Sequence, residues 1–237
     1  MDENLADAHL QLANSHLDEW NWTAAEAEYK RAIELNPNLI DARRKYAAFL
    51  TVIGRYDEAL KEAKRVEELD PLTLYTKLTV PYVLVSARRY DEAIAEYKKM
   101  LELDRNYSGT YLFLGNAYIG RGMFREAITA FQEAIRFGDN SPSVQIYLGA
   151  AYAGAGEREK ARGILKQLET SKEYVSHGEL PVLYVALGER ERAFASLEKA
   201  YAAHDLHLQY LKVEPGFDPL RDEPRFQDLL RRVGLSP

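Results

Sequence analysis

An alanine that recurs every 34 residues constrains the fold of this chain more than any other feature. It lies at Ala25, Ala59, Ala93, Ala127 and Ala161. In four of these five units an aromatic residue precedes the alanine by three positions, as Trp22, Tyr56, Tyr90 and Phe124. A constant period of this length indicates a stack of repeated supersecondary units.

Each unit reads as a pair of helices, because its apolar residues are spaced three and four apart in two successive stretches. Small residues such as Ala13 and Gly115 fall where the paired helices must approach closely. Glycines at Gly54, Gly122, Gly156 and Gly188 suit the turn between the two helices. Thr23 and Glu26 have the spacing of a capping box, which predicts the start of the first unit's second helix. Because one helix pair cannot bury its apolar face alone, the pattern predicts a single elongated all-α domain.

The repeat resembles the tetratricopeptide repeat, whose signature runs W-x2-L-G-x2-Y, A-x3-F and then P over 34 residues. The matching pieces include Leu114-Gly115 with Tyr118, Ala25 with Tyr29, and the closing Pro37. The resemblance implies a right-handed α-α superhelix of about six helix-turn-helix repeats with a C-terminal capping helix. Within one domain, 1–237, the expected repeats are 6–39, 40–73, 74–107, 108–141, 142–173 and 174–205, followed by a cap at 206–237.

Two prolines interrupt this pattern. Pro81 and Pro181 take the place of the small residue in the first helix of their repeats. Proline removes a backbone donor and crowds the carbonyl four residues earlier. We therefore expect a kink or a late helix start in repeats three and six.

The C-terminal stretch leaves the repeat and predicts a turn-rich link followed by a short amphipathic helix. Asp222 can cap this helix and Pro224 suits its first turn. Its apolar face is Phe226, Leu229, Leu230 and Val233. This ending resembles the ends of tetratricopeptide arms in bacterial multidomain signalling and transcription-regulator proteins. Both a free-standing array and an arm of a longer protein fit that resemblance.

Composition and charge exclude several classes of function. The chain has no cysteine, which excludes disulfides and thiolate metal sites. A formal charge of −6 argues against nucleic acid as a partner. No apolar run is long enough to insert into a membrane, and the acidic start has no secretory pattern. We expect a cytoplasmic protein.

Nothing in the sequence predicts catalysis or a cofactor. The nucleotide-binding, nucleophile-elbow and zinc-protease motifs are all missing. His204, Asp205 and His207 could offer a metal two imidazoles and a carboxylate, which leaves a metal-dependent enzyme as the least favoured alternative. The expected catalytic, metal-binding and cofactor-binding sets are therefore empty.

The first helices of such an array line its concave face, which these folds use for binding. The repeat register places eight candidate partner-binding residues there: Asn14, Arg44, Lys45, Tyr75, Tyr82, Phe113, Asn116 and Tyr147. The register also turns Leu10 and Ile146 toward the groove. Its aromatic centre suits a partner protein or a peptide with apolar anchors. The alternative, that these rings pack between repeats, stays open at the level of sequence.

Two narrower functions are a clamp for a peptide C-terminus and self-association. The family's clamp for a peptide C-terminus uses lysine, arginine and asparagine in successive first helices. Asn14 matches it, but Leu10 stands where a lysine is needed and the next repeats supply only Lys45 and Thr79, which argues against that activity. A self-association module is the principal alternative to partner binding, with the cap helix, through Phe226 or Leu230, or the exposed end helix pairing with a second copy. We accordingly expect a monomer or a weak homodimer.

Overall fold

The protein is an array of paired helices, seen in a computed structural model that describes residues 3–235. The elements run in the order α1 (Glu3–Asp18), α2 (Trp22–Leu35), α3 (Ile40–Val52), α4 (Tyr56–Leu69), α5 (Leu74–Lys77), α6 (Thr79–Ser86), α7 (Tyr90–Leu103), α8 (Ser108–Arg121), α9 (Phe124–Arg136), α10 (Pro142–Gly154), α11 (Arg158–Glu169), α12 (Pro181–Ala186), α13 (Arg190–Ala202), η1 (Leu206–Tyr210), η2 (Pro215–Leu220) and α14 (Pro224–Arg232). Over these residues the predicted all-α fold is confirmed.

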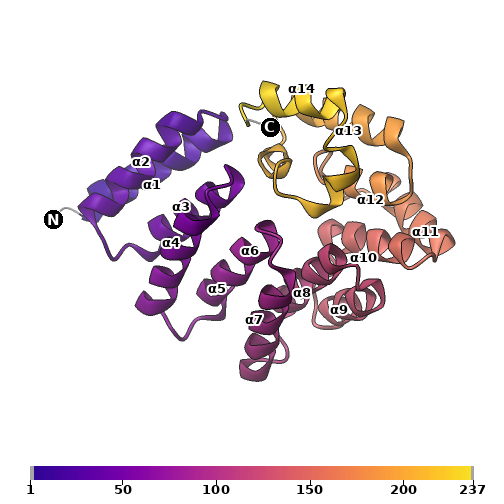
Figure 1. Ribbon diagram of the computed structural model, residues 1–237, viewed down its shortest axis with the longest axis horizontal. Helices are drawn as coiled ribbons and strands as arrows, with labels where there is room; N and C mark the ends of the chain where they lie inside the picture. The colour runs from indigo at the N-terminus through magenta and orange to yellow at the C-terminus, as the bar shows by residue number, and fades with distance from the viewer. Residues whose placement is uncertain (1–2, 236–237) are drawn as a thin grey trace.

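Successive helix pairs form an arc that runs from α1 and α2 around to α12 and α13 (Figure 1). Each helix packs on its partner and on the next pair, as α8 does on α9 and α9 on α10. The recurring alanines are fully buried between them. The buried apolar residues form two clusters, one along the first helix pairs and one along the later pairs and the C-terminal segment, and the two clusters meet at α10.

Gly115 shows why the small positions of the repeat matter. A Cβ atom added there would lie 2.5 Å from the ring of Phe131, on the paired helix. The turn glycines have a different role, because Gly54 and Gly122 both adopt a positive φ. Glycine tolerates that backbone conformation without the steric cost of a side chain.

Replacing Gly115 with alanine should destabilise the protein by about 1–3 kcal/mol, since the new methyl group overpacks the contact with Phe131. Gly163 of α11 is the matched control, because a Cβ there meets nothing within 4 Å. Gly163→Ala should instead stabilise the helix by about 0.5–1 kcal/mol. Urea unfolding of both variants measures the difference. Equal effects of the two substitutions would contradict the close approach of α8 and α9.

Both prolines interrupt their helices as predicted. The first helix of repeat three is divided at Leu78 into α5 and α6, and Pro81 lies in the first turn of α6. In repeat six, α12 starts only at Pro181. A proline is tolerated in a first helical turn because the backbone donor that it lacks has no intrahelical partner there.

Two predicted helix caps were wrong. The cap of α2 is Asn21, whose side chain accepts a bond from the amide of Ala24, while Thr23 already lies inside the helix. α14 follows Glu223 without a side-chain cap bond, so Asp222 is not its cap. Pro224 does occupy the first turn of α14, as predicted.

The C-terminal residues fold back inside the arc, where η1 and η2 lie in the middle of Figure 1. They contribute buried side chains to the core, including Leu208, Leu211, Phe217 and Leu220. The apolar face of α14 is likewise buried, with Phe226 and Leu230 at most 2% exposed. These two side chains are therefore unavailable to a second copy, so the predicted role of Phe226 and Leu230 in self-association was wrong.

The two ends of the array touch. The indole nitrogen of Trp22 donates to the carbonyl oxygen of Val233 over 2.8 Å. Beside it, the rings of Trp20 and His204 stack with their centroids 3.8 Å apart. The first helix pair thus contacts the C-terminal end, and the arc closes on itself.

Candidate functional site

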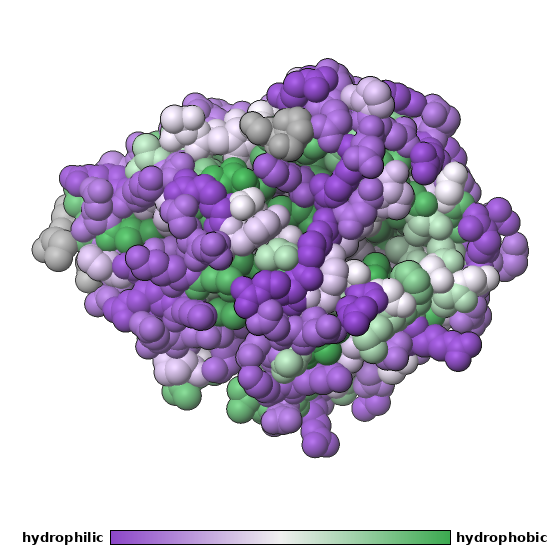
Figure 2. Space-filling model, in the orientation of Figure 1, coloured by the Kyte–Doolittle hydropathy of each residue, from purple (hydrophilic) through white to green (hydrophobic). Residues whose placement is uncertain are grey.

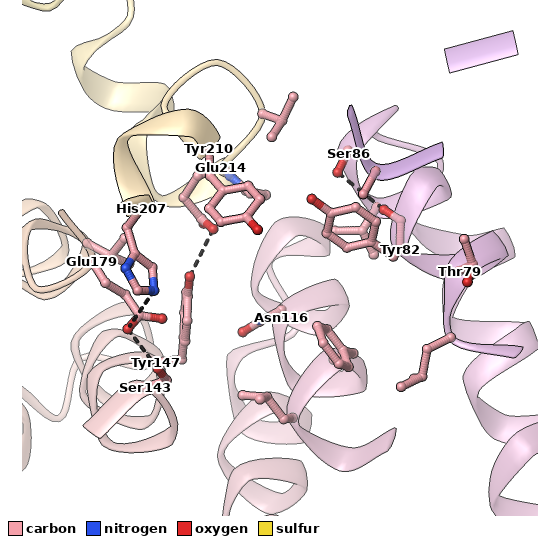
Figure 3. A pocket seen from close by; sticks show the side chains of 18 of the residues that line it. Thr79, Tyr82, Ser86, Asn116, Ser143, Tyr147, Glu179, His207, Tyr210 and Glu214 are labelled. Carbon is pink, nitrogen blue, oxygen red and sulfur yellow. Dashed lines mark hydrogen bonds and ion pairs between the residues drawn. The ribbon is translucent and has the colours of Figure 1, made fainter. Parts of the chain in front are cut away.

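A cavity of about 430 Å³ lies between the first helices of the repeats and the returning C-terminal segment. Its walls come from α3, α5, α6, α7, α8 and α10 on one side and from residues 178–182 and 207–217 on the other. Figure 3 shows side chains from both sides converging on this space. On the face shown in Figure 2, hydrophilic residues dominate, and smaller groups of hydrophobic residues are visible between them.

Six of the eight residues predicted from the sequence line this cavity: Arg44, Tyr75, Tyr82, Phe113, Asn116 and Tyr147. The other two do not. Asn14 and Lys45 bond to each other over 3.1 Å outside it, and Tyr29 donates to the same Asn14 oxygen. Leu10 and Ile146 were wrongly placed in the groove, since both are buried in the core.

The aromatic residues of the cavity both pack on neighbouring rings and line the cavity. Phe113 stacks on Tyr97 with centroids 6.4 Å apart, and Tyr147 stacks on Phe131 at 6.3 Å. Phe113 and Tyr147 are nevertheless only partly buried and line the cavity. Tyr75 is 50% exposed, with the Arg44 guanidinium 4.5 Å from its ring centroid.

Glu179, Tyr210 and Glu214 also line the cavity, and the repeat register did not place them there. His207, which the sequence suggested only as a metal ligand, lines it as well. Glu214 accepts a bond from the Tyr147 hydroxyl at 2.9 Å and another from the amide of Gly216 at 2.8 Å. No periodic pattern marks these residues, because they lie in turns and short segments outside the helical repeat. The only local signal is the Glu-Pro-Gly turn at 214–216.

A second polar group joins repeats five and six to the C-terminal segment. Glu179 accepts a bond from the Ser143 hydroxyl at 2.7 Å and lies 3.7 Å from Nε2 of His207. The other ring nitrogen of His207 lies 3.1 Å from a carboxylate oxygen of Asp205. The imidazole is thus held between two carboxylates.

Burial and hydrogen bonding shift the acidities of these groups. Loss of hydration raises the pKa of the Glu214 carboxyl and that of Glu179 above their usual range. The bond to Asp205 is the main cause that raises the pKa of His207. Burial also raises the pKa of Tyr147, which stays a neutral hydrogen-bond donor.

We expect the contribution of His207 to stability to decline as pH rises. Its pKa in the folded protein is above the unfolded value of 6.5. The folded state therefore binds the proton more tightly, so the stabilisation is complete below about pH 6.5 and disappears as pH rises through the folded pKa. Urea unfolding between about pH 5.5 and 8.5 should show the native protein and His207→Gln converging in stability. A gap that stays constant or widens would contradict this arrangement.

The structure does not support the metal-site alternative at the start of the C-terminal segment. His204 stacks on Trp20, whereas His207 bonds to Asp205, so the two imidazoles have different partners. Between residues 3 and 235, no group of three histidine or acidic side chains is arranged to hold a metal ion. Over the same residues, no helix has the length and apolarity needed to cross a membrane.

Two solved structures resemble this arrangement over nearly their whole length. PilW, described as a widely conserved type IV pilus biogenesis factor, superposes with a TM-score of 0.63 at 18% identity, over 95% of this chain and 98% of its own. PilF of Pseudomonas aeruginosa gives a TM-score of 0.59 at 19% identity, over 87% of this chain and 95% of its own. At such identities the likeness concerns the fold alone.

A third solved structure shares the fold, and family models then identify the family. A thermophilic tetratricopeptide-repeat protein of Thermus thermophilus is 23% identical, with a TM-score of 0.57, over 82% of this chain and 97% of its own. No curated protein matches the chain. Family models described as tetratricopeptide repeat match residues 10–72 and 84–145, slightly more than half of the chain together. With its helix pairs and buried alanines, the chain belongs to the tetratricopeptide-repeat family.

Proposed function

We propose that this chain is a non-enzymatic interaction module that binds a segment of a partner protein on the concave side of the array. A general role in protein interaction or assembly fits the family and its structural relatives. The observation that supports the concave side is the convergence of Tyr75, Phe113 and four other predicted residues on one cavity. The negative formal charge of −6 favours a protein over a nucleic acid as the partner.

The returning C-terminal segment limits the part of the concave face that a partner can contact. η1 and η2 occupy the middle of the arc, so a whole helix cannot lie along the concave face as in an open groove. A partner segment would instead contact the edge of the cavity at Tyr75 and Arg44 and insert a side chain between Tyr82 and Phe113. Aromatic anchors of this kind contribute most of the affinity in many interfaces.

Affinity capture from a lysate of the source organism tests this proposal. The native chain is compared with a Tyr75→Ala, Asn116→Ala double variant, which spares the fully buried core. Leu103→Ala is the control, because it removes an exposed apolar side chain outside the cavity. We expect a partner that the native chain and the control retain and the double variant loses. Equal capture by all three would contradict the concave site.

A further inference from the structure

Several side chains that line the cavity have buried polar atoms without hydrogen-bond partners in the described part of the chain. Seven buried side-chain polar atoms have no hydrogen-bond partner among the described residues, and four of them belong to cavity-lining residues: Arg44, Tyr82, Tyr97 and Asn116. Tyr97 is fully buried, and its hydroxyl is one of the four. Because an unpaired buried polar group costs free energy, such clustering indicates a place built for a ligand.

Comparison of equivalent positions in the repeats explains why the side chains of Tyr82, Tyr97 and Asn116 have unpaired atoms. In the first repeat the hydroxyl of Tyr29 donates to Asn14 over 3.1 Å, which joins the two helices of the pair. The same two positions hold Tyr97 and Tyr82 in the third repeat, and Phe131 and Asn116 in the fourth. The tyrosine–asparagine bond of the first repeat is missing from both. The side chains that therefore keep an unpaired atom, Tyr82, Tyr97 and Asn116, all line the cavity.

The charges at the C-terminal side of the cavity determine which ligand suits it. Glu214 has no ion pair among the described residues, and Glu179 has only His207, at 3.7 Å and shared with Asp205. Arg88, the basic group that acts on Glu214 from farther away, is paired with Asp218 at 2.7 Å. Both carboxylates therefore lack a dedicated counter-ion.

The positive charge of the cavity is placed elsewhere. Arg44 stacks over Tyr75 and pairs with Asp41 at 3.3 Å. Between that side and the carboxylates lie aromatic faces, and Figure 3 shows Tyr82 and Tyr210 turned toward each other across the space. Aromatic faces next to a carboxylate attract an organic cation by its charge and by the ring quadrupole.

We propose that the cavity binds an organic ammonium group carried on an apolar stem. The ammonium lies between Glu214 and Glu179 and donates to their carboxylate oxygens, while the stem packs against Phe113 and Tyr82. This chemistry belongs both to a free arylalkylamine and to a lysine side chain of a partner segment. If the ammonium belongs to a partner's lysine, the inference rests on the proposed function, because that lysine would be the side chain that the partner inserts into the cavity.

Calorimetric titration with 2-phenylethylamine tests the ligand class, with 2-phenylethanol and 3-phenylpropionate as neutral and anionic analogues. We expect saturable binding of the amine, with both analogues at least about 10-fold weaker, because neither supplies the cation. Equal or tighter binding of the alcohol or the acid, or no saturable binding of any probe, would overturn the proposal.

Variants locate the ammonium. Glu214→Gln keeps an oxygen for the Tyr147 hydroxyl but removes the charge, so it should weaken amine binding about 10-fold or more. Glu102→Gln removes the same charge from an exposed position and should leave binding unchanged. Circular dichroism checks that both variants fold, and Glu179→Gln serves as the second site variant. Unchanged amine affinity in both site variants would overturn the assignment of the carboxylates.

A pair of peptides separates the two sources of the amine. Acetyl-Phe-Lys-amide is compared with the same peptide acetylated on its lysine side chain. Binding of the free-lysine peptide alone supports the partner's lysine, and binding of 2-phenylethylamine without either peptide supports a small amine. A failure of the amine and peptide titrations is distinct from a failure of the proposed function. The latter is decided by whether the Tyr75→Ala, Asn116→Ala variant loses the captured partner.

Discussion

Replacing Phe226 with aspartate should destabilise the protein by at least about 3–5 kcal/mol, the range for losing a large buried aromatic side chain. Phe226 is fully buried and packs against Phe217 with ring centroids 5.8 Å apart. The substitution also places a carboxylate in the apolar core without a counter-ion, which adds to the cost. Urea unfolding followed by circular dichroism measures the change.

Asp222→Ala is the control for this prediction. Asp222 is exposed and makes no cap bond to α14, so its replacement should change the free energy of unfolding by less than about 0.5 kcal/mol. Loss of a genuine cap would cost about 1 kcal/mol. If Phe226→Asp kept native stability and merely dissociated an oligomer, Phe226 would be the self-association residue and its burial in the cap would be contradicted.

The second large effect is expected where the two ends of the array meet. Trp22→Ala removes the bond to the Val233 carbonyl and the ring's contact with Phe49, whose centroid is 6.3 Å away. Because Trp22 is only partly buried, we expect a loss of about 2–4 kcal/mol, somewhat below that of a fully buried tryptophan. Amide hydrogen exchange should accelerate both in the first turn of α2 and around Val233.

Trp22→Phe separates the bond from the packing. It keeps an aromatic ring but removes the indole donor, and should cost about 1–2 kcal/mol less than alanine does. Faster exchange confined to α1 and α2 in the alanine variant would contradict the closure of the arc. It would show that the first helix pair depends only on its neighbour in the sequence.

Much of the fold could be predicted from the sequence, because the same residue types recur at the same helix contacts in each repeat. The alanine period requires close helix contacts, and Gly115 lies against Phe131 as expected. Pro81 and Pro181 likewise have effects that are local to their own backbone. Local signals failed where two nearby residues could both cap a helix. At the start of α2 the cap is Asn21, and the predicted capping residue, Thr23, already lies inside the helix.

The candidate site was only half predictable. Repeat register placed Tyr82 and Asn116 on the inner face, because equivalent positions of a repeat share an orientation. Glu214 could not be found in this way. It meets Tyr147 from 67 residues farther along the chain, through a turn-rich segment whose direction depends on packing. The repeat therefore predicts an open groove, whereas in the folded chain the C-terminal segment narrows the groove to a cavity.

Thiol protection tests the central claim, that a partner covers the concave side, most directly. The chain has no cysteine, so Tyr75→Cys at the cavity edge and Leu103→Cys outside it each provide a single reactive thiol. The rate of maleimide labelling is measured with and without the captured partner. We predict that the partner slows labelling at position 75 at least about 10-fold and leaves position 103 unchanged, because a desolvated interface excludes the reagent. Protection at position 103 with full reactivity at position 75 would place the partner elsewhere and contradict the claim.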